Sequence, residues 1–419
     1  MRAVVAPGVV MAERRSPFQA LAVVSYRWFA LAQVLGNGAM WMHRTAHVWL
    51  VVQISGGDGV AVGVVTGLQY ISMILLGLSG GALGDRFDKR RIMLMTQSVV
   101  VLASVVLAVL IAGDAVTLPI AYLFAVLLGV PGALDAPVRL AYPRQLVPYR
   151  FLAAAVGLNG AVFQLARVAG PALAGGVIAF SGTAAVFAVV ALFGLVSCLA
   201  LVRVRPLPGG EKAEAEEPAG GRRGLADLRA PAYLVPLLGG LMLGIGMTHL
   251  QLAIPLLVDS TEKDAAGSFG ALTAMIGAGG IVGAGLAASL RSEPTNRILL
   301  AWSAVFAAVT VLVSTLPSGL ILAAGLFVAG ATMQVFGTSA ISALQLRSPA
   351  NVQGRMMALY VIAFFVWVPV GAPIFGWFAN LVGARQALGV SGLVCLAVVG
   401  LLALSFLTGR AVTREQHRE

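Results

Sequence analysis

Six polar side chains lie inside long apolar stretches of this chain, where each is a candidate for substrate binding or proton transfer: His43, Arg44, His47, Gln164, Arg167 and His249. An ionisable group at membrane depth is costly to keep, so its presence indicates a function. Histidine titrates near neutral pH and suits a proton carrier. Arginine presents a planar fork of N–H donors that matches carboxylate, phosphate or catecholate-like oxygens.

The histidines leave other interpretations open. His43 and His47 are four residues apart and could together ligate a metal ion. No third ligand lies nearby in the sequence, so we expect no metal site and no cofactor. His249 could equally be hydrogen-bonded within a helix bundle, with no part in proton transfer.

Carboxylates are missing from the same stretches. The chain has 17 acidic residues, and none lies deep in an apolar run. Cation exporters commonly place a carboxylate inside the cavity, because a buried cation needs a partner. Arg44 and Arg167 instead predict a substrate that is anionic, or neutral and oxygen-rich. The alternative is that both arginines bond backbone carbonyls or face water.

Helices that cross a lipid bilayer must position these side chains. Hydrophobic residues make up 59% of the chain and charged residues only 11%, whereas soluble domains carry about 25% charged residues. A bilayer core needs about 20 apolar residues per helix. We predict an all-α membrane protein whose twelve spans are approximately Trp28–Ile54, Val60–Gly84, Arg91–Ala112, Leu118–Pro137, Phe151–Phe180, Ala184–Val202, Tyr233–Val258, Ser268–Leu290, Ile298–Leu316, Gly319–Leu344, Met356–Leu381 and Ala387–Leu407.

The basic residues predict the orientation. If both termini are cytoplasmic, all but four of the 28 Lys and Arg residues fall in cytoplasmic segments. The four are Arg44 and Arg167 within helices, and Lys263 and Arg385 outside. Cytoplasmic loops of membrane proteins collect basic residues. The net charge of +11 therefore reports topology, and we expect no nucleic-acid partner.

Two similar halves are expected on either side of a polar linker. We place a cytoplasmic segment at 1–27, a six-helix bundle at 28–202, the linker at 203–231, a second bundle at 232–408 and a cytoplasmic tail at 409–419. Three glycines of the fifth helix, Gly170, Gly175 and Gly182, recur 201 residues later as Gly371, Gly376 and Gly383. Transporters are often built from such repeats, with the substrate site between the halves.

A motif lies between the second and third helices, where the chain reads G-A-L-G-D-R-F-D-K-R-R from Gly81 to Arg91. It resembles the signature of the major facilitator superfamily, G-x-L-x-D-R-x-G-R-R, with Asp88 in place of the second glycine. The resemblance implies two pseudo-symmetric six-helix bundles and a loop that holds the halves together on the cytoplasmic side. The alternative is a basic loop that only sets topology.

Three further stretches are similar to one branch of that superfamily, the enterobactin exporters and transmembrane secretion effectors. They are Trp41–Arg44, Asp135–Arg139 and Gly354–Tyr360. In that branch an acid commonly stands before the tryptophan of the first helix, and Val48 takes this position here.

The cytoplasmic gate that the resemblance implies comprises Gly81, Leu83, Asp85, Arg86, Lys89, Arg90, Asp135 and Arg139. Asp135 and Arg139 are four residues apart and could pair along a helix, or Asp135 could join the cluster around Asp85. Close packing and a proline kink are expected in the fifth helix at Gly170, Pro171, Gly175 and Gly176.

The resemblance predicts a transporter and not an enzyme. We expect it to export a small siderophore-, metabolite- or drug-like molecule across the bacterial inner membrane by alternating access, as a monomer driven by the proton gradient. Import by symport or uniport in the same fold is one alternative. A non-transporting receptor or assembly factor is another, and unpaired charges at the membrane midplane argue against it.

Overall fold

The computed structural model describes residues 19–207, 231–259, 265–289, 294–348 and 350–415. Within these ranges, the side chains of residues 73, 77–86, 231–232, 259, 350–355, 358 and 406–415 lie outside the described part of the structure. Most of the predicted linker at 203–231 also falls outside it.

The N-terminal half begins with a short 3-10 helix, Gln19–Ala22, and contains α1 (Val24–Ser55), α2 (Gly59–Arg86), α3 (Lys89–Ala112), α4 (Leu118–Ala141), the short α5 (Pro143–Leu146) and α6 (Tyr149–Arg203). Helix α6 has 55 residues, far more than one span needs. Its backbone leaves helical geometry at Gly182, where φ is 79° and ψ is 172°. Helix α6 therefore supplies two spans, and this half has six.

The C-terminal half contains α7 (Pro231–Asp259), α8 (Ala265–Ser289), α9 (Asn296–Thr315), α10 (Leu320–Arg347), α11 (Ala350–Phe365), α12 (Val368–Val382) and α13 (Ala384–Glu415). Helices α11 and α12 form a single span that is interrupted at Val366 and Trp367. Ten helices of the described residues are long and apolar enough to cross a membrane. Counting α6 twice and adding α1 gives the twelve predicted spans.

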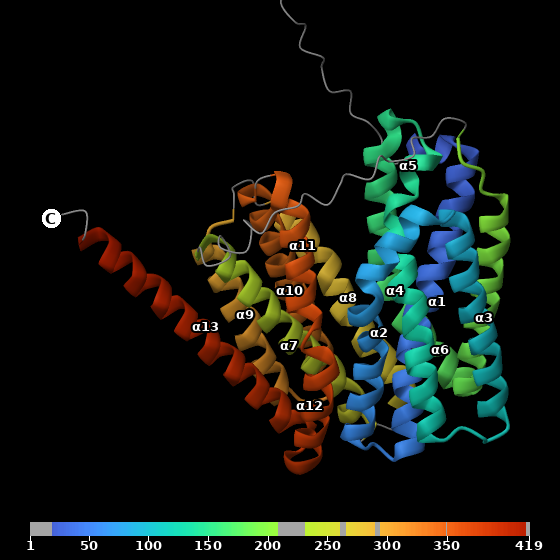
Figure 1. Ribbon diagram of the computed structural model, residues 1–419. Helices are drawn as coiled ribbons and strands as arrows, with labels where there is room; N and C mark the ends of the chain where they lie inside the picture. Colours follow the sequence, from blue (N-terminus) through green and yellow to red (C-terminus); the bar gives the residue numbers. More distant parts are fainter. Residues whose placement is uncertain (1–18, 208–230, 260–264, 290–293, 349, 416–419) are drawn as a thin grey trace, which may run out of the picture.

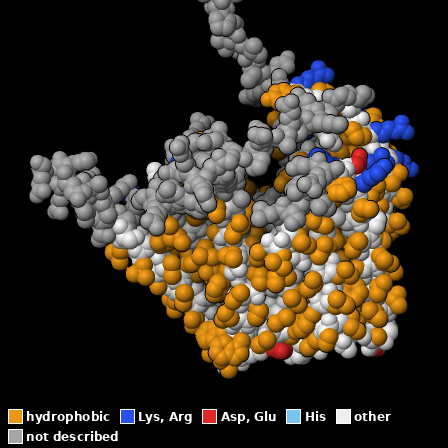
Figure 2. Space-filling model, in the orientation of Figure 1, with side chains coloured by type: hydrophobic (Ala, Val, Ile, Leu, Met, Phe, Trp, Pro, Cys, Tyr) orange, Lys and Arg blue, Asp and Glu red, His pale blue; other side chains and the backbone are white. Residues whose placement is uncertain are grey.

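The two ends of the bundle differ in charge. Lys89, Arg90, Arg91, Arg144 and Arg150 lie at one end, which we call the basic end, and Figure 2 shows Lys and Arg side chains gathered there. On the face that Figure 2 shows, apolar side chains cover most of the described surface away from the basic end, as lipid contact requires. We call the opposite end the distal end.

Glycine conformations at the distal end confirm that the halves are related. Gly182 and Gly383, which are 201 residues apart, both adopt positive φ, at 79° and 90°. Only glycine takes this backbone region readily. Each glycine links the fifth span of its half to the sixth, so the repeat seen in the sequence reproduces the same turn twice.

The two halves touch through small residues in the distal part of the bundle. Helix α2 packs on α12, where a Cβ added to Gly63 would lie 2.3 Å from the Ala372 carbonyl oxygen. Helix α6 packs on α8, where a Cβ added to Gly175 would lie 2.6 Å from the Cα of Gly270. Figure 1 shows the halves side by side and diverging toward the basic end.

Polar contacts complete this distal closure. The backbone N–H of Gly59 donates to Oδ1 of Asn380 at 2.8 Å. The amide of Asn380 donates in turn to Oδ1 of Asp58 at 2.6 Å. The structure is therefore the distal-closed state of the molecule.

Candidate functional site

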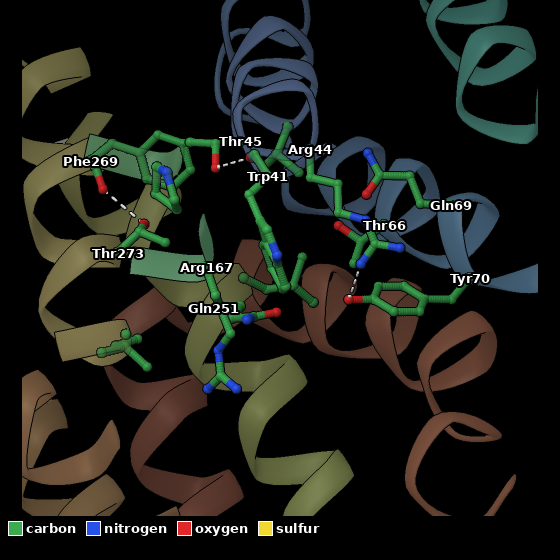
Figure 3. A pocket seen from close by; sticks show the side chains of 15 residues that line it. Trp41, Arg44, Thr45, Thr66, Gln69, Tyr70, Arg167, Gln251, Phe269 and Thr273 are labelled. Carbon is green, nitrogen blue, oxygen red and sulfur yellow. Dashed lines mark hydrogen bonds between the residues drawn. The ribbon is translucent and has the colours of Figure 1, made fainter. Parts of the chain in front are cut away.

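A cavity lies between the two halves and contains about 720 Å³ of space free of atoms, including the part open to solvent. Helices α1, α2 and α6 form one wall, and α7 and α8 form the other (Figure 3). No acidic residue is among the described residues that line it. The lining residues are Trp41, Arg44, Thr45, Val48, Thr66, Gln69, Tyr70, Arg167, Pro171, Gln251, Leu252, Phe269, Thr273, Ile276 and Gly277.

Arg44 is held in this cavity by aromatic side chains. Its Nη1 donates to the hydroxyl of Tyr70 at 2.8 Å. Its guanidinium carbon lies 4.6 Å from the centroid of the Tyr70 ring and 5.7 Å from that of Trp41. The Tyr70 ring also stacks on Phe365 of the other half, with centroids 5.4 Å apart. Cation–π contacts stabilise the charge, but no carboxylate of the described residues forms an ion pair with it.

Arg167 lies where α6 meets α8 of the opposite half. A Cβ added to Gly277 would come within 3.0 Å of the Cα of Val168, so only glycine permits this close approach. A Cβ at Gly280 would lie 3.6 Å from Nη2 of Arg167. That nitrogen is buried and has no hydrogen-bond partner among the described residues. The small residues of α8 thus let a cation of one half face the other.

His43 and His47 point away from the cavity, into the core of the N-terminal half. Their ring centroids lie 5.4 Å and 6.4 Å from that of Phe187. Nε2 of His47 lies 3.0 Å from the carbonyl oxygen of Ala121. Neither ring nitrogen of His43 has a partner in the described part of the chain.

His249 is hydrogen-bonded within the C-terminal half. Its Nδ1 lies 2.5 Å from Oγ of Ser391, and Nε1 of Trp367 donates to its Nε2 at 3.5 Å. Its ring stacks on Phe375, with centroids 4.6 Å apart. His249 and Gln164 are both absent from the cavity lining. Of the six predicted residues, the structure thus places only Arg44 and Arg167 on the cavity.

A pattern in the sequence also indicates three further residues that line the cavity. Thr66, Gln69 and Tyr70 are polar positions in the apolar second span, spaced i, i+3 and i+4. This spacing puts them on one face of a helix. In the structure they line the α2 side of the cavity.

The predicted pair of Asp135 and Arg139 is present as an ion pair along α4. Arg139 also donates to the side-chain oxygens of Gln33 and, at 3.1 Å, of Gln97. Gln33 donates in turn to Asn159 at 2.7 Å. This buried network ties α1, α3, α4 and α6 together inside the N-terminal half, as an orienting pair would.

The loop motif shows how the chain accommodates Asp88 where the signature has glycine. Asp88 has a φ of −58°, which requires no glycine, and its carboxylate accepts from the backbone N–H of Arg91 at 2.9 Å. It therefore caps the N-terminus of α3. Arg90 donates to the carbonyls of Leu201 and Val202 at the end of α6, where a cation is favourable.

The rest of the predicted gate is less fully described. Lys89 is the first residue of α3. The side chains of Gly81, Leu83, Asp85 and Arg86 lie outside the described residues. The proposed contact of this loop with the other half therefore stays a prediction.

Three of the four positions named in the fifth span lie close to other helices. A Cβ at Gly170 would lie 2.5 Å from Cβ of Trp41 in α1, and Gly175 contacts α8 as described above. The carbonyl oxygen of Pro171 would lie 2.8 Å from a Cβ on Gly270. Gly176 faces open space, with nothing within 4 Å of an added Cβ, so the packing role does not apply to it.

Twelve spans in two related halves, around a central cavity closed at one end, define the architecture of a secondary transporter. The chain matches the transmembrane secretion effector family over residues 15–416. It belongs to that family, within the major facilitator superfamily, as a multi-pass protein of the bacterial inner membrane.

Among curated relatives, the chain is 27% identical to the enterobactin exporter EntS of Salmonella typhimurium, over 88% of this chain and 85% of that protein. It is 30% identical to the uncharacterized MFS-type transporter y4rN of Sinorhizobium fredii, over 62% of this chain and 65% of that protein. The staphyloferrin A transporter of Staphylococcus aureus is 28% identical over 35% of this chain and 36% of its own length.

Solved structures share the fold at low sequence identity. A bacterial homologue of the human lysosomal transporter Spinster, inward-facing and unoccupied, gives a TM-score of 0.74 at 14% identity and covers 90% of this chain and 96% of its own. The inward-open xylose transporter XylE from E. coli gives 0.69 at 14% identity, with 92% and 95% covered.

Proposed function

We propose that the protein exports a small organic molecule from the cytoplasm by alternating access, with protons moving inward in exchange. The observation that carries this proposal is the cavity between the halves, lined from both sides and closed at the distal end. If the basic end is cytoplasmic, as the excess of basic residues indicates, the structure is an inward-facing state that receives its substrate from the cytoplasm.

The direction of transport draws support from the relatives. Two of them are named for the export of enterobactin and the transport of staphyloferrin A. The central cavity has no ionisable carboxylate on its described lining. Proton exchange is therefore assigned to groups away from the cavity: Asp135 beside Arg139, Asp85 of the loop, and the three buried histidines.

Closure of the basic end is assigned to the loop between α2 and α3. In the distal-open state, Asp85 would meet the other half and hold the basic end shut. Arg90, bound to the end of α6, keeps the loop attached to its own half.

The experiment has two steps. Molecules retained in and released from cells with and without the gene are compared, which identifies a substrate. Its uptake is then measured into inverted membrane vesicles, with an imposed pH gradient and after the gradient is collapsed. Export by antiport predicts gradient-dependent accumulation in these vesicles. Accumulation in intact cells instead would favour import, and no movement in either system would favour a receptor or assembly factor.

A locked variant supplies the control. Asp58→Cys and Asn380→Cys, in a chain whose Cys198 and Cys395 are replaced by alanine, place two thiols where the side chains now share a hydrogen bond. Oxidation should stop transport, and reduction should restore it. Unimpaired transport by the oxidised protein would contradict alternating access through this closure.

A further inference from the structure

Three hydrogen-bond donors without a partner in the described part of the chain belong to residues of the cavity wall. Nε1 of Trp41, Nε2 of Gln69 and Nη2 of Arg167 are all buried, and none has a partner in the described part of the chain. All three residues line the cavity (Figure 3), and Gln69 as a whole residue is only 7% exposed. Buried donors are nearly always satisfied in folded proteins. Of these three residues, only Arg167 also carries a charge, and a ligand in the cavity would supply the acceptor that its guanidinium lacks.

The charge on the cavity points to an anion. Arg44 and Arg167 both line it, and no acidic residue does so among the residues described. The hydroxyls of Thr45 and Thr273 donate to the carbonyls of Trp41 and Phe269, at 3.0 Å and 2.8 Å. They therefore supply no further donors, and their lone pairs remain available to a ligand hydroxyl.

The opposite wall is largely apolar. Leu252, Phe269 and Ile276 come from α7 and α8 of the C-terminal half. A ligand that fills the cavity therefore meets positive charge on one side and, apart from Gln251 and Thr273, hydrocarbon on the other. This division suits a molecule with an acidic head and an apolar body.

We propose that the cavity binds an organic carboxylate, with its acidic oxygens on Arg167 and its apolar body against α7 and α8. The proposal rests on the proposed function in taking this cavity as the substrate site. Arg167 makes the main contact, because its Nη2 is unpaired. Arg44 is already bonded to Tyr70 and supplies a second positive charge.

The test measures binding and needs no transport. Full-length protein in lipid nanodiscs is titrated with three probes of matched size, 2-naphthoate, 2-naphthylmethylammonium and 2-naphthalenemethanol, by isothermal calorimetry. A charge-assisted hydrogen bond corresponds to a difference of roughly 10- to 100-fold in affinity. We expect 2-naphthoate to bind at least tenfold more tightly than the other two probes.

Substitutions identify the residues that cause the preference for 2-naphthoate. Arg167→Gln should abolish the preference for 2-naphthoate, Arg167→Lys should retain part of it, and Arg44→Gln should weaken it. Arg144→Gln is the matched control, because Arg144 is exposed at the basic end, and it should bind as the wild type does. Size-exclusion profiles and melting temperatures of all variants establish that they fold.

Three results would overturn the proposal. The first is equal or tighter binding of the ammonium probe by the wild type, and the second is no binding of 2-naphthoate by the wild type at millimolar concentration. The third is an anion preference that survives in both Arg167→Gln and Arg44→Gln. Anion binding without export in vesicles would refute the proposed function alone, whereas export of a substrate without anion preference would refute this proposal alone.

Discussion

A pair of neighbouring glycines in α6 allows a sharp test of the distal closure. Gly175 and Gly176 are adjacent in the same helix, but only Gly175 faces the other half. Its added Cβ would lie 2.6 Å from the Cα of Gly270 and 2.9 Å from the carbonyl oxygen of Ala266, both in α8, whereas a Cβ on Gly176 would meet nothing within 4 Å. Gly175→Ala should therefore force the halves apart, and Gly176→Ala should not.

The magnitude follows from the geometry. Restoring an ordinary contact of 3.4 Å from 2.6 Å requires α6 and α8 to separate by about 0.8 Å. Overpacking of this kind costs about 1–3 kcal/mol, which corresponds to roughly a 5- to 150-fold change in an equilibrium. The gain from replacing a helical glycine by alanine, about 0.5–1 kcal/mol, is the same in both variants and cancels in the comparison.

The assay is the rate of disulfide formation between cysteines at positions 58 and 380, which lie across the closure. Both glycine variants are made in that background and oxidised under identical conditions. Gly175→Ala should cross-link several-fold more slowly than Gly176→Ala, which should match the parent. Equal rates in the two variants would refute the claim that close approach of α6 and α8 stabilises the distal-closed state.

Three other changes have defined outcomes. Arg139→Gln leaves the Asp135 carboxylate buried without its ion-pair partner and should lower the free energy of unfolding by about 3–5 kcal/mol. The loss should be smaller when Asp135→Asn is added, and thermal unfolding in detergent measures both variants. Asp88→Ala removes the cap of α3 and should cost about 1 kcal/mol, visible as a lower melting temperature, whereas a gain would contradict the capping role. Asp85→Asn should insert normally but transport more slowly in vesicles, and wild-type transport at equal protein level would end the gate hypothesis.

Local patterns in the sequence translated well into structure. The ion pair of Asp135 and Arg139 could be predicted because it needs only a spacing of four residues along one helix. The turns at Gly182 and Gly383 could be predicted because they need only a backbone conformation that glycine adopts. Twelve spans followed from apolar runs, because a bilayer imposes a fixed helix length.

The direction in which each side chain points could not be predicted from the sequence. His43 and Arg44 are consecutive, and consecutive residues of an α-helix point about 100° apart. Arg44 therefore faces the cavity while His43 faces Phe187 in the core. Which of the two would do so depends on how α1 rotates against its neighbours. The contact of Arg44 with Tyr70 likewise joins two different helices. No local sequence pattern determines how these two helices are aligned along each other.

Helix α1 raises a problem of biogenesis. It is fully described, and yet it is not among the helices apolar enough to cross a membrane by composition. Two of its polar side chains find their contacts late: His47 on the carbonyl of Ala121, and His43 on the ring of Phe187. At about 5–20 residues per second, a ribosome needs on the order of 10 s to reach Phe187 after α1 emerges. During that interval α1 must be retained by the insertion machinery or at the membrane surface, so its final placement awaits the sixth span.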